Sequence, residues 1–310
     1  MTAGRPVDPD GAPAASRWRP ALEPLAALLR DRTAAVGLAI VLGFVLVAVA
    51  APWLAPYDAE EQHIADALQG PSATYRLGTD EYGRDLLSRV IYGTRPALLI
   101  GVLSVLLSMA IGIPLGILAG YRMGWVDRAT SWFVDLMLSF PSLLMALLIV
   151  TLLGPGQELT VIVAIGLSHV PVFVRLARAS TLVVKNLDFI TASRAFGSRD
   201  ARIMCRHIMP NILGPIVIMG TLSIAGAIRQ EASLSFLGLG IQPPAPSWGN
   251  MIREGTSDIL QSPWVAVVPG AFLSLSVFAF NMIGDALRDL LDPRGLTSNT
   301  RTRPSGRRRP

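Results

Sequence analysis

Polar side chains that could do chemistry interrupt the apolar stretches of this sequence at few positions, among them Asp135, His169 and Asn281. Such groups inside an apolar segment can line a solute pathway or relay protons. Arg128 precedes Asp135 by seven residues on the same helical face, which favours an interfacial ion pair for Asp135. His169 has no acidic or histidine neighbour within one helical turn, which favours a packed, hydrogen-bonded side chain. A pathway role is the alternative for each.

Asn281 and Asp285 are four residues apart and share a helical face, which suits either a capped helix end or a polar pathway. Trp248 lies in a proline-rich run and is a further candidate for a pathway or gate residue. We favour the structural role for Asn281 and keep the pathway role as the alternative.

The spacing of the remaining reactive residues predicts no enzyme and no metal centre. The chain has three scattered histidines and one cysteine, Cys205. Zinc needs clustered ligands, and covalent catalysis needs a nucleophile beside a base. The phosphate-binding pattern GxxxxGK[ST] is absent from the sequence. We therefore expect no catalytic residue, no metal and no cofactor in this chain. An intramembrane hydrolase would need such groups, so the sequence does not favour that class of protein.

A polar island at 186–210 separates two strongly apolar segments. We expect a short helix capped by Asp188 and ended at Gly197, a second helix capped by Ser198, and a third that Pro210 allows to begin. One face of the first helix carries small side chains, namely Thr191, Ala192, Ser193 and Ala195. Small side chains let another protein's backbone come close, so this face is a candidate docking surface. A loop that packs on its own membrane ends is the alternative.

The composition indicates a membrane protein. Of 310 residues, 51% are hydrophobic and 16% are charged, and the mean hydropathy is +0.48. Soluble domains carry about 25% charged residues. The net charge of +5 comes from arginines that punctuate the apolar runs, and nucleic-acid binding would need them gathered on one soluble face.

Six apolar segments are long enough to cross a bilayer, which predicts an all-α polytopic protein. They are 33–54, 97–121, 129–153, 159–176, 212–228 and 264–286. Six crossings place both termini on one side. Most of the 27 lysine and arginine residues lie on that side, so the positive-inside rule makes it the cytoplasm. The segment 186–210 then faces the cytoplasm.

The polar segments at 55–96 and 230–262 are expected to be extracytoplasmic. In the first, Thr79 is expected to cap a helix with Asp80 and Glu81 in its first turn. Its apolar stripe would lie on the membrane surface before the second crossing. In the second, the prolines around Trp248 cannot sit in lipid unprotected.

Several runs resemble the permeases of binding-protein-dependent ABC transporters. The segment 186–210 resembles their EAA loop, in which Thr191 replaces the acidic residue and Ser193 the second alanine. The residues matched there are Thr191, Ala192, Ser193, Gly197 and Pro210. The run LGTDEYGRDLLSR resembles the segment before the second membrane helix of C-type permeases in dipeptide, oligopeptide and nickel importers. Its motif residues are Leu77, Gly78, Thr79, Asp80, Gly83, Arg84 and Asp85. The runs SFLGLGIQPPAPSWGNMI and FNMIGDALRDLLDPR resemble the same subunit.

The resemblance implies the permease fold of type I ABC importers, with cytoplasmic termini, in the cell membrane. Four parts follow: a largely disordered cytoplasmic segment at 1–32, a first helix and extracytoplasmic segment at 33–96, a five-helix core at 97–290, and an arginine-rich tail at 291–310. The core contains a loop at 186–210 that couples to an ATPase.

The implied partners are a second homologous permease, one or two cytoplasmic ATPases that bind ATP and magnesium, and an extracytoplasmic substrate-binding protein. The resemblance implies import of dipeptides or oligopeptides, with nickel or another small solute as the alternative. An ATP-independent channel or secondary transporter is the alternative of another class, although we find no paired intramembrane ions or inverted repeats typical of it.

Overall fold

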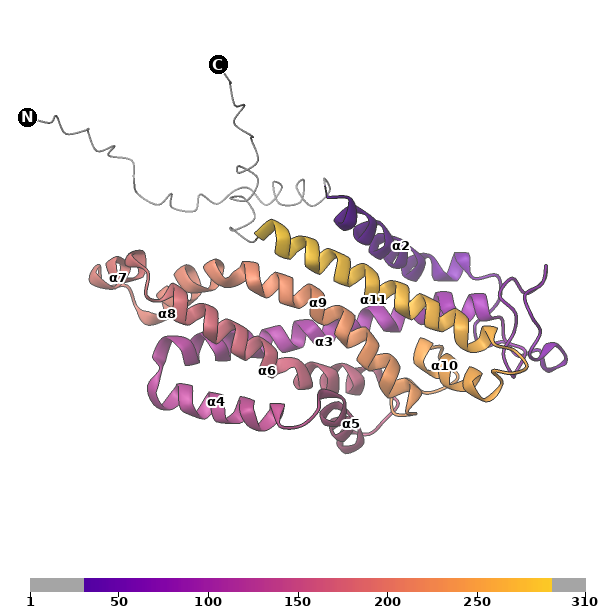
Figure 1. Cartoon of the computed structure of the whole chain (residues 1–310). Coiled ribbons are helices and arrows are strands. Elements are labelled where there is room, and N and C mark those ends of the chain that lie inside the picture. The colour runs from indigo at the N-terminus through magenta and orange to yellow at the C-terminus, as the bar shows by residue number, and fades with distance from the viewer. Residues whose placement is uncertain (1–30, 292–310) are drawn as a thin grey trace, which may run out of the picture.

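Long α-helices run side by side along most of the molecule (Figure 1). The computed structural model describes residues 31–291. Most of the expected N-terminal segment 1–32 and nearly all of the tail 291–310 lie outside the described residues. Within 31–291 the regular elements are all helices, which confirms the predicted fold class.

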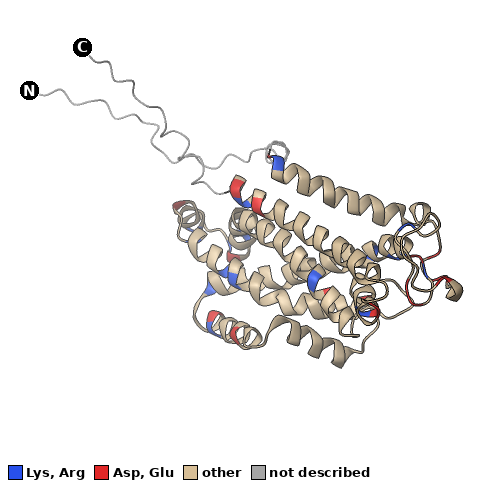
Figure 2. Cartoon of the chain, turned by 45° about the vertical axis from the view of Figure 1, so that its right-hand side comes forward, with Lys and Arg blue, Asp and Glu red and all other residues tan. Residues whose placement is uncertain are grey.

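Five helices are long and apolar enough to cross a membrane: α2 (Arg32–Leu54), α3 (Leu86–Arg122), α6 (Glu158–Val184), α9 (Met209–Phe236) and α11 (Trp264–Leu291). The pair α4 (Gly124–Leu138) and α5 (Ser142–Leu153) makes a sixth crossing if it is counted as one bent span. Most of α2 and α11 is free of charge, and charged residues lie only at the start of α2 and in the last turns of α11 (Figure 2).

Shorter helices lie at the two ends of this bundle. One end carries α7 (Asp188–Ala195), α8 (Asp200–Arg202) and the π-helical turn η2 (Ile203–Ile208). The opposite end carries α10 (Trp248–Ser257) and the irregular segment 55–85, which includes the 3-10 turn η1 (Ile64–Asp66).

The crossing predicted at 129–153 consists of two helices, α4 and α5, with a sharp bend between them. The axes of α4 and α5 differ by 91°. The break falls before Pro141, which has no backbone N–H to donate and disfavours helical geometry in the residue that precedes it. The helix therefore ends at Leu138 and starts again at Ser142.

Three other helices are longer than the sequence predicts. The sequence predicts a separate surface helix capped by Thr79. This prediction is wrong, because α3 begins at Leu86 and continues without a break into the membrane span. The helix α6 runs on to Val184, and α9 runs on to Phe236.

Polar residues near the end of α9 do not stop the helix, because α5 and the next turn of α9 itself supply hydrogen-bond partners. Gln230 donates from Nε2 to Ser142 O at 3.0 Å, and Glu231 Oε1 accepts from Ser235 Oγ at 2.7 Å. All of Gln230, Glu231 and Ser235 are buried. The helix therefore continues through 230–236, into the polar segment that the sequence predicts to be extracytoplasmic.

The most extensive helix packing joins α3 to α6. Gly112, Gly116 and Gly120 repeat every four residues and so lie on one face of α3. A Cβ atom added to Gly116 would lie 2.5 Å from Val174 O, and one added to Gly120 would lie 2.8 Å from Arg178 O. Small residues let two helix backbones approach in this way. The glycine face is therefore what places the ends of α3 and α6 side by side.

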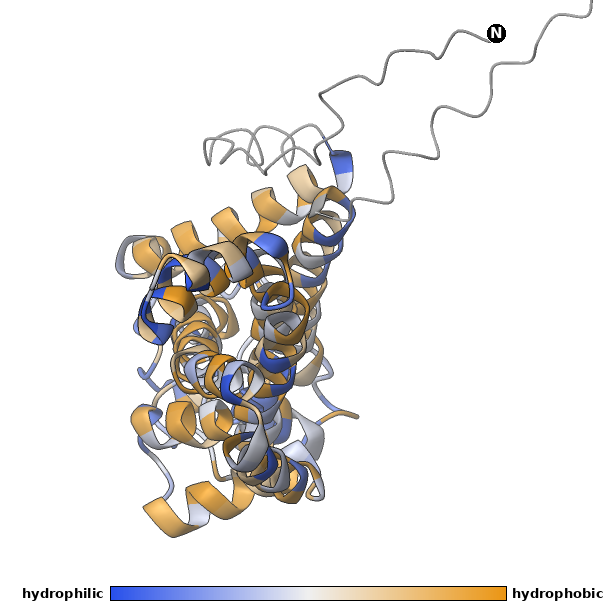
Figure 3. Cartoon of the chain, turned by 90° about the vertical axis from the view of Figure 1, so that its left-hand side faces the viewer, coloured by the Kyte–Doolittle hydropathy of each residue, from blue (hydrophilic) through white to orange (hydrophobic). Residues whose placement is uncertain are grey.

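Large apolar side chains also cover outward-facing sides of the bundle. Exposed examples are Leu46, Val49, Leu103, Leu106, Leu148, Leu152 and Phe278. Figure 3 shows orange over the outer helices when the bundle is viewed from the end that carries α7. An apolar exterior of this kind suits contact with lipid chains.

We predict that Gly116→Val destabilises the protein. The new side chain would overlap the α6 backbone, and overpacking of this kind costs about 1–3 kcal/mol. The melting temperature of the purified protein in detergent should fall. Gly43→Val is the matched control, since nothing lies within 4 Å of a Cβ at Gly43 on α2. Equal melting temperatures for the two variants would show that the glycine face does not govern packing.

Candidate functional site

The helix α7 projects past the ends of α3 and α6 (Figure 1). Ile190 is its one buried residue. Ile190 packs in an apolar cluster with side chains from η2, α3 and the neighbouring helices, including Ile203, Ile208, Ile113 and Ile117. Ile190 is therefore the apolar anchor that fixes α7 to the bundle, and most other side chains of α7 are exposed.

The turn after α7 is closed by backbone hydrogen bonds. Gly197 has a φ of +79°, which side chains resist and glycine accepts. Its N–H donates to Arg194 O at 2.9 Å, and the Ser198 N–H donates to Ser193 O at 3.1 Å. This pair of bonds is the Schellman arrangement for a helix C-terminus. The prediction that Gly197 ends this helix is confirmed.

The two predicted caps in this segment are wrong. Leu187 occupies the cap position of α7, and Asp188 is the first helical residue. Arg199, rather than Ser198, precedes α8. The reason is that the Ser198 N–H takes part in closing α7, so the next helix begins later. Pro210 lies at the start of α9, as predicted.

The accessible surface of α7 carries small side chains and two aromatic rings. Thr191 and Ala192 are exposed, and Ser193 is half-buried. Phe196 is 91% exposed and Phe189 is 43% exposed. Our sequence reasoning missed these two rings, although their spacing of seven residues in a polar segment places them on one helical face. An exposed aromatic side chain beside a tight turn is well suited to enter a groove on a partner protein.

Ion pairs fasten α4 to α6 near the α7 end. Arg175 Nη2 lies 2.7 Å from Asp135 Oδ1, so the predicted pairing of Asp135 with Arg128 is wrong. Arg178 Nη2 lies 2.7 Å from Asp127 Oδ2. Because α4 and α5 are bent, α4 packs along α6, and its carboxylates face arginines on that helix. Both residues of the Asp135–Arg175 pair are exposed, which fits an interfacial position.

The other candidate pathway residues lie on separate elements. His169 is half-buried on α6, with Nδ1 3.0 Å from Ile165 O, which confirms the packed, hydrogen-bonded arrangement. Trp248 is 1% exposed, and its indole N–H donates to Val90 O at 3.1 Å. Asn281 is half-buried on α11. Among residues 31–291, no hydrogen bond or ion pair joins any two of Asp135, His169, Trp248 and Asn281.

The motif at 77–85 forms a tight loop at the opposite end of the bundle. The predicted cap at Thr79 is wrong, because its hydroxyl donates to Asp66 O and accepts from the Gln69 N–H. Asp85 is the residue that caps α3, and its carboxylate accepts from the Ser88 N–H at 2.8 Å. Asp80 Oδ1 accepts from the backbone N–H groups of Tyr82 and Arg84 inside the loop.

Two glycines allow this loop to form. Gly83 has a φ of +72°, and a Cβ there would lie 1.8 Å from His63 O. Gly78 has a φ of +87°, and a Cβ there would lie 2.5 Å from Gln69 O. Both positions therefore require glycine for conformation and for space.

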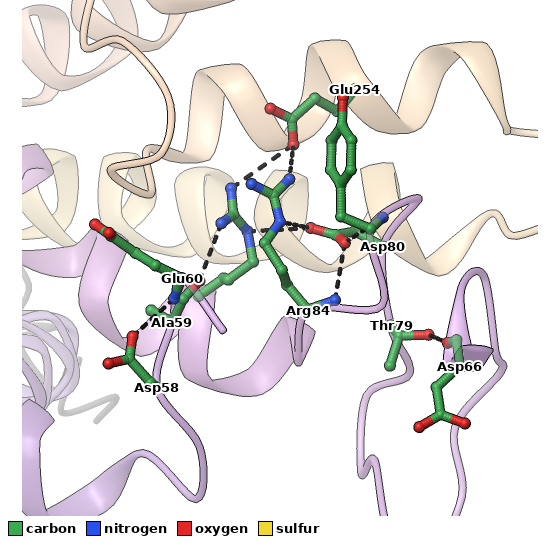
Figure 4. A network of polar contacts seen from close by, with 10 residues as sticks. Asp58, Ala59, Glu60, Asp66, Thr79, Asp80, Arg84 and Glu254 are labelled. Carbon is green, nitrogen blue, oxygen red and sulfur yellow. Dashed lines mark hydrogen bonds and ion pairs between the residues drawn. The ribbon is translucent and has the colours of Figure 1, made fainter. Parts of the chain in front are cut away.

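A buried ionic cluster joins this loop to α10 (Figure 4). Arg84 contacts Asp80 Oδ2 at 2.6 Å and Glu254 Oε2 at 3.0 Å. Arg89 lies 3.4 Å from Asp80 Oδ2 and donates to Ala59 O at 3.1 Å. Burial raises the pKa of Glu254, while the nearby Arg89 and Arg84 oppose that effect. A buried charge without its partner is costly, so these four side chains hold the loop and α10 together.

A polar hollow of about 550 Å³ opens beside this cluster. It lies between the loop, α10 and the segment around Pro243, and its lining includes Glu81, Tyr82 and Arg253. Its walls carry charges of both signs, so polar side chains of a partner protein would find hydrogen-bonding groups there.

Two family models match this chain. The model of the binding-protein-dependent transport system inner membrane component matches residues 112–295. The model of the N-terminal transmembrane domain of oligopeptide transport permease C matches residues 16–71. The first match contains α7 and the turn at Gly197.

Curated relatives align over most of their length. The dipeptide transport system permease protein DppC of Alkalihalophilus pseudofirmus is 41% identical, over 93% of this chain and 94% of the relative. The di/tripeptide transport system permease protein DppC of Pseudomonas aeruginosa is 46% identical, over 83% and 87%. The glutathione transport system permease protein GsiD of Pectobacterium atrosepticum is 44% identical, over 86% and 88%.

A solved structure of the MetNI methionine ABC transporter in an inward-facing conformation has a similar fold. One of its chains aligns with a TM-score of 0.56 at 19% identity, over 67% of this chain and 98% of that chain. This similarity confirms the predicted ABC importer permease fold. Together with the two family models and the curated relatives, it establishes that the chain belongs to the binding-protein-dependent transport system inner membrane components, among the dipeptide and oligopeptide permeases.

Proposed function

We propose that this chain is a membrane-spanning subunit of an ATP-driven importer that carries short peptides across the cytoplasmic membrane. The observation that carries the proposal is α7, an exposed helix held by one apolar anchor and closed by Gly197. The names of the aligned relatives refer to a dipeptide, to di- and tripeptides and to glutathione, which are all short peptides. These names favour a peptide over nickel as the transported solute.

The proposed orientation places α7 in the cytoplasm and the 77–85 loop outside. Its support is the excess of arginine on the side of α7. In this orientation 33–96 supplies the first crossing and outer segment, and 97–290 supplies the core. The chain carries no phosphate-binding motif, so ATP and magnesium would bind to one or two cytoplasmic ATPases and not to this subunit.

The proposed coupling works by rigid-body movement. ATP-driven closure of the ATPases would move α7, whose exposed face includes Thr191 and Phe196. Ile190 would transmit that movement to the helices in contact with it. A second, homologous permease would complete the pathway, and access would then alternate between the two sides of the membrane. An extracytoplasmic binding protein would dock on the outer segment.

Uptake measurements test the transport assignment. Deleting the gene for this chain should abolish uptake of a radiolabelled dipeptide, and a plasmid copy should restore it. Arsenate, which depletes ATP, should block this uptake more strongly than a protonophore. Restored uptake of nickel in place of the dipeptide would overturn the substrate assignment, and uptake that survives ATP depletion would identify a channel or secondary transporter.

We predict that Gly197→Val weakens binding of the ATPase to this subunit and so impairs transport. A β-branched residue resists positive φ at a cost of about 1–2 kcal/mol, which is too little to prevent membrane insertion but enough to redirect α7. The variant should be abundant in the membrane, retain little ATPase on purification and transport poorly. Gly197→Asn is the matched control and should have a milder effect, because asparagine tolerates this conformation. Full ATPase retention by Gly197→Val would refute docking at α7.

We predict that Arg84→Ala loosens the outer segment. Removing Arg84 leaves the buried Asp80 and Glu254 short of one positive charge, and breaking a buried ion pair in this way costs about 3–5 kcal/mol. Protease added outside the cell should cleave the segment 55–85 faster, and binding-protein-dependent uptake should fall. Arg76→Ala is the control, since Arg76 is an exposed arginine of the same segment. Identical cleavage rates would mean that the cluster does not hold this segment.

A further inference from the structure

Tyr121 lies in the last turn of α3 and contacts both short helices that flank the Gly197 turn. Its hydroxyl donates to Asp200 Oδ1 on α8 at 2.7 Å. The same oxygen accepts from Arg194 Nη2 on α7 at 3.3 Å. The Arg194 guanidinium also lies over the Tyr121 ring, 5.6 Å from its centroid. One side chain of a membrane-spanning helix therefore bridges α7 and α8.

The rest of the contact between α7 and the bundle is apolar. Ile190 lies in the isoleucine cluster with residues of η2 and α3. Apolar packing holds α7 to the bundle but sets its orientation only weakly, because the hydrophobic effect has no preferred direction. Hydrogen bonds to Tyr121 are directional and so fix the angle of α7 relative to α3.

These polar contacts are also easily reversed. Tyr121, Arg194 and Asp200 make their hydrogen bonds at an exposed position, where water competes for the same groups. The contact from Arg122 Nε to Asp200 Oδ2 is longer, at 3.8 Å. A contact that breaks and reforms at low cost suits a joint between a moving helix and the membrane span.

We propose that Tyr121 is a positioning residue that couples the angle of α7 to α3. This inference rests on the proposed function of α7 as the ATPase contact and adds the route by which its movement reaches a membrane helix. Tyr121 touches neither nucleotide nor solute in this role. It acts through Arg194 and Asp200, which lie on the two sides of the turn at Gly197.

The test removes the hydroxyl and keeps the ring. Tyr121→Phe in the assembled transporter, reconstituted in liposomes with its binding protein, should keep ATPase association and ATP hydrolysis. The number of ATP molecules hydrolysed per peptide imported should rise roughly two- to tenfold, the range expected for the loss of one or two such hydrogen bonds. If Tyr121 had only a structural role, Tyr121→Phe would reduce assembly of the transporter and leave this ratio unchanged.

Tyr92→Phe is the matched control. Tyr92 lies toward the other end of α3 and also has an arginine, Arg95, over its ring at 5.4 Å. This variant should leave the ratio unchanged. In Tyr121→Phe, the further change Asp200→Ala should add little, because both substitutions remove the hydrogen bond from the Tyr121 hydroxyl to the Asp200 side chain.

Three outcomes would overturn the inference: an unchanged ratio in Tyr121→Phe, an equal rise in Tyr92→Phe, or fully additive effects of Tyr121→Phe and Asp200→Ala. Failure of the underlying proposal is recognised separately. If Gly197→Val retains both the ATPase and transport, α7 is not the coupling helix. If Gly197→Val fails as expected while Tyr121→Phe behaves like the wild type, only the role of Tyr121 is refuted.

Discussion

The close packing of α3 against α6 is the contact on which the rest of the structure depends. The glycine face at 112–120 lets the two backbones approach until a single added Cβ would collide with Val174 O or Arg178 O. In a membrane, the hydrophobic effect does little to bring helices together, so such close van der Waals contact has to supply the attraction. With α3 and α6 fixed, their ends determine where the outer loop begins and where α7 starts.

The polar contacts at the two ends of the bundle differ in how far they are buried. At the end that carries the 77–85 loop, Arg84 and Arg89 lie in a largely buried cluster with Asp80 and Glu254, where the loss of a partner is costly. At the α7 end, the ionic and hydrogen-bonding contacts of Asp135, Tyr121 and Asp200 are exposed, and solvent screens them. The contacts at the end with the 77–85 loop are therefore costly to break, while those at the α7 end can break and reform at low cost.

The motif residues of the outer loop are explained by its conformation. Gly78 and Gly83 permit positive φ, and Asp85 caps α3. Asp80 accepts from its own loop and pairs with Arg84. These motif residues thus build a folding unit. A polar hollow beside Tyr82 and Arg253 stays open next to this loop.

The sequence by itself determined which segments enter the membrane, which end carries the arginines, and where a glycine must end α7. These features are local, because the length of an apolar run, a charge count and a positive φ each depend on a few adjacent residues. Only the tertiary structure decided that Asp135 pairs with Arg175, that Thr79 bonds to Asp66 O, and that Tyr121 reaches Asp200. Each of these contacts joins residues separated by 13 to 79 positions in the chain, and nothing in the residue types selects one partner over the alternatives. The bend at Pro141 and the close approach of α3 to α6 bring such partners together, so they emerge only when the helices are packed.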